Sequence, residues 1–229
     1  MVNWSIAAKK AILRFEGLAP EAMTRNLRTA CDLIDCARWL RECSMYPASV
    51  SLPDRFKVFD RIAQDVSSKV ILYLEFGVWT GVSLKYWSRL LRNPRSMLHG
   101  FDSFEGLPEH WRQDHPKGRF DTSGSMPELS DERVKLFKGW FTETLSQYVM
   151  PEHDALVINI DCDLYSSTKD VLDYLKESIQ IGDWLYFDEF GSWDHECRAF
   201  REFIAHTQMK FEAVAESNAF WSVAFRRTN

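Results

Sequence analysis

The sequence predicts an α/β fold, in which a mostly parallel β-sheet with an antiparallel last strand is joined to an N-terminal helical cap. From residue 70 onward, short apolar runs typical of buried strands alternate with amphipathic helical segments. This alternation predicts parallel strands connected by right-handed crossovers. Near the end of the chain, strand-like runs at 211–215 and 220–225 are separated only by a short turn, which predicts a hairpin.

The first third of the chain, residues 1–66, is the expected cap, and residues 67–229 form the expected main domain. A helix beginning near Pro20 would carry an apolar stripe, and a shorter helix would begin near Asp54. Two prolines and several serines interrupt the pattern between them, at 44–53. Three interpretations of the cap stay open: it packs on the main domain, it borders the substrate pocket, or it forms a dimer contact. The stripe consists of Met23, Leu27, Ala30, Ile34 and Ala37.

The main domain divides into elements that follow its apolar periodicity. Between residues 102 and 134 this periodicity is absent. Because the segment is long and leaves the edge of the sheet where ligands bind, we interpret it as a lid rather than as simple flexible surface. The expected strands are 70–76, 97–101, 134–137, 155–160 and 184–187, and the expected helices are 81–91, 141–149, 167–179 and 195–207.

Composition excludes several classes of protein. The chain has 229 residues and a formal net charge of −5, so no general affinity for nucleic acid is expected. No run of 18 apolar residues occurs, so no membrane span is expected, and the first fifteen residues favour a packing helix over a membrane anchor. Five cysteines without a CxxC pair favour a reduced, cytoplasmic protein.

Acidic residues follow three of the expected strands. Glu75 ends the first, Asp161 with Asp163 follows another, and Asp188 with Glu189 follows a third. Asp161 and Asp188 are 188 − 161 = 27 residues apart, enough for a helix and a second strand. If those strands are neighbours, their ends lie roughly 5 Å apart. Three carboxylates that converge in this way would bind a divalent cation. Asp163 is given a different role: we expect it to cap the helix that begins near Ser166.

The first strand leads into Glu75-x-Gly77-x-x-x-Gly81, a turn in which the backbone can approach a ligand. This is not the GxGxxG pattern, and Glu75 would repel a phosphate. It suits a cationic or hydroxyl-bearing group, such as the amino acid part of S-adenosylmethionine. Asp102, which ends the next strand, lies where an acid accepts the ribose hydroxyls of an adenosyl cofactor.

Four segments resemble the macrocin O-methyltransferase family: EFGVWTG at 75–81, GFDSFEGLP at 100–108, KGWF at 138–141 and IDCDLYSST at 160–168. The resemblance covers roughly 70–225 and implies a Rossmann-like class I methyltransferase sheet. Members depend on S-adenosylmethionine and a metal ion, and they methylate sugar hydroxyls in natural-product pathways. The resemblance therefore implies that 67–229 is a methyltransferase domain with a small hydroxylated acceptor, and it is compatible with a homo-oligomer.

The resemblance also implies roles for individual residues. Asp161, Asp188 and Glu189 would bind Mg²⁺, and Asp161 would also accept the proton from the acceptor; a nearby histidine such as His110 or His115 is the other candidate base. The chain departs from the family pattern at Glu189, where the family has aspartate, and at Cys162, where it has glycine. The implied cofactor-binding residues are Glu75, Phe76, Gly77, Val78, Trp79, Gly81, Asp102, Ser103, Phe104, Glu105, Gly106, Gly139 and Asp161.

Three rival functions stay open. Asp161-Cys162-Asp163 reads as the DxD metal motif of a glycosyltransferase that uses a nucleotide sugar, but this leaves Glu75 and the glycine turn unexplained. An NAD-dependent oxidoreductase is disfavoured because GxGxxG is missing. A non-catalytic scaffold that keeps the fold is disfavoured by the intact set of carboxylates.

Overall fold

The computed structural model describes residues 5–16, 20–45, 50–112 and 114–229. Its centre is an eight-stranded sheet in the order β1-β7-β8-β6-β5-β2-β3-β4. Strand β8 runs antiparallel to both of its neighbours, and every other pair is parallel, which confirms the predicted sheet. The strands are β1 (Val50–Leu52), β2 (Ile71–Phe76), β3 (Met97–Asp102), β4 (Val134–Lys138), β5 (Ala155–Ile160), β6 (Trp184–Phe187), β7 (Phe211–Ser217) and β8 (Ser222–Arg227).

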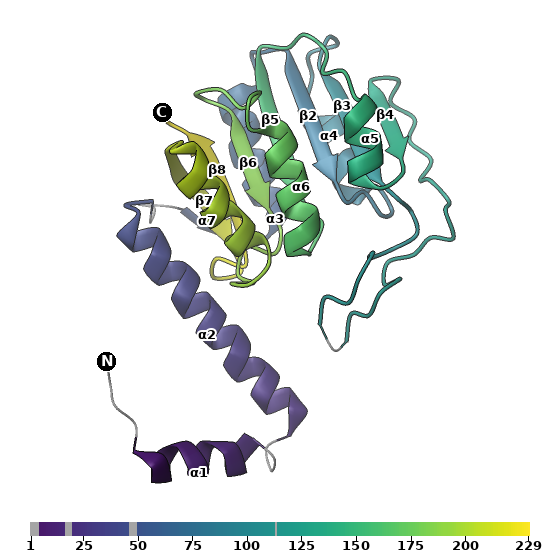
Figure 1. Ribbon diagram of the computed structural model, residues 1–229. Coiled ribbons are helices and arrows are strands. Elements are labelled where there is room, and N and C mark those ends of the chain that lie inside the picture. Colours follow the sequence, from purple (N-terminus) through teal and green to yellow (C-terminus); the bar gives the residue numbers. More distant parts are fainter. Residues whose placement is uncertain (1–4, 17–19, 46–49, 113) are drawn as a thin grey trace.

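Helices cover both faces of the sheet (Figure 1). One face packs against α3 (Arg55–Val66) and α4 (Val82–Leu90), and the other against α5 (Phe141–Gln147), α6 (Tyr165–Leu175) and α7 (Glu196–Thr207). Strands β2, β5 and β6 are buried along their whole length. Because parallel strands covered on both faces cannot expose either side, they read as continuous apolar runs rather than alternating ones.

The order of the strands creates a switch point between β2 and β5. From β2 the chain moves outward to β3 and then β4, and it afterwards returns past β2 to form β5 and β6. The loops leaving β2 and β5 therefore diverge in opposite directions. In open α/β sheets a ligand cleft forms at this place, outside the carboxyl ends of the strands.

The N-terminal helices extend away from the sheet (Figure 1). Helix α2 (Glu21–Glu42) forms where the apolar stripe predicts it, but only its last turns pack on the domain, through the fully buried Cys36 and Leu40. Most of the stripe is open to solvent, with Ile34 57% exposed, so this face does not pack on the main domain and the other two interpretations of the cap stay predictions. Helix α1 (Ile6–Glu16) likewise leaves Ile6 and Ile12 exposed. No helix in the described ranges is both long enough and apolar enough to cross a membrane.

Residues 50–66 belong to the α/β layers rather than to the helices ahead of them. Strand β1, which the sequence did not predict, pairs in parallel with β7, Val50 lying opposite Ala215. Asp54 caps α3 by accepting a hydrogen bond from the backbone N–H of Lys57 at 3.0 Å. The sequence predicted helix α3. The helix packs on the sheet so that its first residue, Arg55, lies at the edge where the ligand cleft opens. The division of the chain at residue 66 stays a prediction.

Candidate cofactor and metal site

A cavity of about 550 Å³ opens at the switch point, over the carboxyl ends of β2, β3, β5 and β6. Carboxylates from all four strand ends line it: Glu75, Asp102, Asp161 and Asp188. The strands are adjacent in the sheet, so residues far apart in the sequence meet at one edge. The volume is within the usual range of small-molecule pockets, roughly 300–1,000 Å³.

The turn after β2 is built around two glycines in the left-handed conformation. Gly77 has a φ of 92°, and a Cβ placed there would lie 1.8 Å from the carbonyl oxygen of Asp161. Its N–H donates to the carbonyl of Phe101 at 3.0 Å, so the turn is held between the ends of β3 and β5. Gly81, with a φ of 72°, begins α4. No side chain fits at residue 77, which brings the bare backbone to the cavity wall.

Asp102 fixes this turn from the end of β3. Its Oδ2 accepts hydrogen bonds from the N–H groups of Val78 at 2.8 Å and Trp79 at 2.7 Å, and its Oδ1 accepts one from Phe104 at 2.7 Å. A carboxylate has about four lone-pair positions, so part of the acceptor capacity of Asp102 stays available to a ligand. The Trp79 ring lies at the cavity, edge-on to Phe120 with centroids 5.7 Å apart.

Glu75 is a buried acid, only 1% exposed, on β2. The hydroxyl of Tyr73 donates to its Oε2 at 2.5 Å, and Asn159 donates to that same hydroxyl at 3.0 Å. Burial raises the pKa of Glu75 to about 8, although these hydrogen bonds and the nearby Arg55 oppose the rise. A positively charged ligand group beside Glu75, such as the ammonium of an amino acid, would favour the ionised form of this carboxylate.

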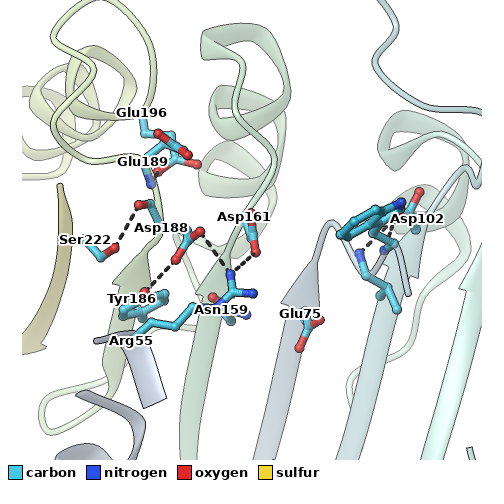
Figure 2. Close-up of polar contacts among 12 residues, drawn as sticks. Arg55, Glu75, Asp102, Asn159, Asp161, Tyr186, Asp188, Glu189, Glu196 and Ser222 are labelled. Atoms are coloured by element: carbon cyan, nitrogen blue, oxygen red, sulfur yellow. Dashed lines mark hydrogen bonds and ion pairs between the residues drawn. The ribbon is translucent and has the colours of Figure 1, made fainter. Parts of the chain in front are cut away.

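Asp161 and Asp188 are held together by one guanidinium (Figure 2). Nη1 of Arg55 lies 3.3 Å from Oδ2 of Asp161 and 3.1 Å from Oδ2 of Asp188. Tyr186 donates to the other oxygen of Asp188 at 2.6 Å, which orients that carboxylate. Burial and the neighbouring charge of Asp188 raise the pKa of Asp161 well above its usual range.

Glu189 does not join this pair in the structure. It lies beside Glu196 (Figure 2), and its N–H donates to the carboxylate of Glu196 at 3.0 Å. Burial and then the charges of Asp163 and Asp188 raise the pKa of Glu189 to about 8. Its Oε2 is buried and has no hydrogen-bond partner among the described residues.

The donor set fits Mg²⁺ through two carboxylates. Among the described residues, no three His, Cys, Asp or Glu side chains are arranged to hold a metal ion. Mg²⁺ is commonly held by one or two carboxylates and retains several waters, so Asp161 and Asp188 suffice for it. The carboxylate of Glu189 lines the same cavity, and its role as a further ligand stays a prediction.

Asp163 is not the helix cap that the sequence predicted. Helix α6 begins at Tyr165 with Leu164 in the capping position, and no side chain caps it. Asp163 instead adopts a left-handed conformation, with a φ of 62°, and is 7% exposed. Burial and the charge of Asp188 raise its pKa to about 7. Because the helix begins earlier in the chain than the sequence predicted, Leu164 is in the capping position and the carboxylate of Asp163 lies on the cavity wall.

The 102–134 segment lines the cavity with Leu107, Glu109 and Phe120. It folds back on itself, since the N–H of Leu107 bonds to the carbonyl of Arg119 at 2.9 Å. Its role as a moving lid stays a prediction. His110 and His115 do not reach the cavity, and no histidine lines it in the part of the chain that the structure describes. Asp161 is therefore the better placed of the candidate bases.

Four residues that touch the site carboxylates were missed from the sequence: Arg55, Tyr73, Asn159 and Tyr186. Tyr73 with Glu75 and Tyr186 with Asp188 are each two residues apart on a strand. Because residues i and i+2 share one face of a strand, this spacing could have revealed both tyrosines. Arg55 lies in no motif, and only the packing of α3 brings it to the cavity.

The fold and this cavity define an α/β protein of the class I methyltransferase type. The chain belongs to the macrocin-O-methyltransferase (TylF) family, whose model matches residues 54–227. Two solved structures share the fold. The O-methyltransferase NovP superposes with a TM-score of 0.64 at 23% identity, over 76% of this chain and 80% of that one. The calicheamicin methyltransferase CalS11 gives 0.58 at 21% identity, over 98% and 94%.

Two relatives carry names that state their reactions. The 8-demethyl-8-(2,3-dimethoxy-alpha-L-rhamnosyl)-tetracenomycin-C 4'-O-methyltransferase of Streptomyces olivaceus is 29% identical over 138 residues, 52% of each chain. The mycinamicin III 3''-O-methyltransferase of Micromonospora griseorubida is 25% identical over 140 residues, 51% of this chain and 54% of that one. The match thus spans about half the length of these relatives.

Proposed function

We propose that this protein transfers a methyl group from S-adenosylmethionine to a hydroxyl of a small molecule, with Mg²⁺ at the Asp161–Asp188 pair. The observation that carries the proposal is the single cavity onto which Glu75, Asp102, Asp161 and Asp188 all open. Membership of the macrocin-O-methyltransferase family supports it. The relatives' names support a sugar or glycosylated natural product as acceptor.

In this proposal the two halves of the cavity have different tasks. Glu75 would bind the ammonium of the cofactor, Asp102 would accept hydrogen bonds from its ribose hydroxyls, and the bare backbone at Gly77 would let the cofactor approach closely. Other cofactor contacts would come from Trp79, Ser103, Gly106 and Gly139. Four residues predicted for this role lie outside the set that lines the cavity: Phe76, Gly81 and Phe104 are buried, and Glu105 is exposed.

The carboxylate end of the cavity performs the proton chemistry. When bound, S-adenosylmethionine supplies the methyl group and Mg²⁺ lowers the pKa of the acceptor hydroxyl. Asp161 accepts the proton from that hydroxyl, and Tyr186 holds Asp188 in place through its 2.6 Å hydrogen bond. Both carboxylates are only partly exposed, which limits the access of water to the reacting groups.

Calorimetric titration with S-adenosylhomocysteine, in Mg²⁺ and then in EDTA, tests the cofactor site. We expect micromolar binding that depends little on the metal. Absence of binding under both conditions would overturn the proposal, and binding of uridine diphosphate instead would favour the glycosyltransferase alternative. The acceptor class is tested by transfer of labelled methyl from S-adenosylmethionine to rhamnosides and to their matching aglycones; labelling of the aglycones alone would contradict a sugar acceptor.

A further inference from the structure

Arg55 is the first residue of α3, and its guanidinium lies between the two aspartates of the candidate metal site. Both short distances, 3.3 Å to Asp161 and 3.1 Å to Asp188, begin at the same nitrogen, Nη1. A single positively charged group therefore lies within reach of one oxygen of each carboxylate. The side chain is 32% exposed, so the contact is partly shielded from water.

The cavity offers no other positive charge to this pair. Arg55 is the one lysine or arginine that lines the cavity in the described ranges. The other charged side chains that line it there are acidic, among them Glu75, Asp163 and Glu189. Two partly buried carboxylates that face one another repel strongly unless a cation neutralises them.

We propose that Arg55 is the resident counter-cation of the Asp161–Asp188 pair, and that a divalent cation binds there only by displacing its guanidinium. This inference rests on the Mg²⁺ site of the proposed function. Mg²⁺ binds carboxylate oxygens at about 2.0–2.1 Å in an octahedral arrangement. Nη1 of Arg55 already lies against the oxygens that such an ion would contact, and like charges repel. The guanidinium and the metal ion are therefore alternative occupants.

Competition of this kind has a measurable consequence for the protein without its cofactor. Removing the guanidinium leaves the carboxylates without their counter-charge, so the free energy of binding a divalent cation becomes more favourable. A lysine at the same position would keep the positive charge and much of the competition. A glutamine would remove the charge and leave a shorter polar side chain. Both variants remove the guanidinium, but only lysine keeps a positive charge, so the pair separates the effect of the charge from that of losing the guanidinium.

The test is Mn²⁺ binding to the full chain, measured by electron paramagnetic resonance of the free ion. We expect Arg55→Gln to bind Mn²⁺ at least about tenfold more tightly than the unmodified protein, with Arg55→Lys closer to the unmodified protein. Arg61→Ala is the matched control: Arg61 lies six residues further along the same helix, pairs with Asp65 at 2.7 Å, and does not line the cavity. Its affinity for Mn²⁺ should not change.

Equal or weaker Mn²⁺ binding by Arg55→Gln would overturn the inference. So would absence of Mn²⁺ binding in every variant. If Arg55→Gln is less stable, its melting temperature supplies a second readout, since Mn²⁺ should raise it more than it raises that of the unmodified protein. Adding Asp188→Asn to Arg55→Gln should abolish the gain, and an unaltered gain would place the ion elsewhere. S-adenosylhomocysteine binding to the unmodified protein is measured separately, so failure of the cofactor site is distinguished from failure of this inference.

Discussion

Replacing Glu75 with glutamine is expected to remove a pH-dependent loss of stability from the cofactor-free protein. The pKa of Glu75 is raised by burial from 4.5 to about 8 in the folded state. As the pH rises between these values, the unfolded chain releases a proton that the folded protein retains. The free energy of unfolding therefore falls by about 1.4 kcal/mol per pH unit in this window, and the loss is complete above the folded-state pKa. A neutral glutamine does not titrate, and it can still accept the hydrogen bond from Tyr73.

The assay is urea unfolding of both proteins at about pH 5 and about pH 7.5. Over this interval of about 2.5 pH units, the stability of Glu75→Gln relative to the unmodified protein should rise by about 3 kcal/mol. Other titrating groups cancel in this difference. Glu177→Gln, at an exposed site on the protein surface, should show no such rise. A relative stability that stays within about 1 kcal/mol across the interval would refute the reasoning. The same variant should bind S-adenosylmethionine more weakly, because it lacks the charge that faces the ammonium.

Three further substitutions test the rest of the site. Gly77 and Gly182 both have a positive φ, 92° and 94° respectively, so replacing either with alanine costs a similar backbone strain of about 1–2 kcal/mol. Only at Gly77 does the added Cβ also meet another atom. Gly77→Ala should therefore lose S-adenosylhomocysteine affinity by calorimetry while Gly182→Ala keeps it; equal losses would contradict the close approach. Asp161→Asn should abolish methyl transfer with cofactor binding still measurable, and undiminished turnover would remove Asp161 from the mechanism. Asp102→Ala removes three hydrogen bonds from backbone N–H groups and should lower the free energy of unfolding, measured by chemical denaturation, by about 3 kcal/mol. A loss below about 1 kcal/mol would contradict the anchoring role of Asp102.

The meeting of Asp161 and Asp188 was predictable on one condition, that their two strands are neighbours in the sheet. Each follows a continuous apolar run, and alternation of strands with helices predicts that the two strands are parallel; the order of the sheet makes them neighbours. Their carboxyl ends must then lie at one edge of the sheet. The family motifs added the prediction of a cofactor site, since they fall on the turns at that edge.

Other features lay beyond the reach of local patterns. Strand β1 is three residues long, and what makes it a strand is its pairing with β7 near the far end of the chain. Glu189 lies beside Glu196 of α7, whose carboxylate accepts a hydrogen bond from its backbone N–H, and no local pattern predicts this contact. The apolar stripe of α2 was visible in the sequence, but periodicity does not state what covers a stripe.

By itself, the sequence determined the α/β class, the mostly parallel sheet with its antiparallel last strand, and the acids at the strand ends. Hydrophobic periodicity and turn residues act over a few residues and can be read from the chain. Only the tertiary structure decided that Arg55 lies between Asp161 and Asp188, that Asp163 lines the cavity instead of capping α6, and that Glu189 turns aside. These arrangements depend on side chains brought together from separate elements, where burial and charge, rather than local propensity, set each contact.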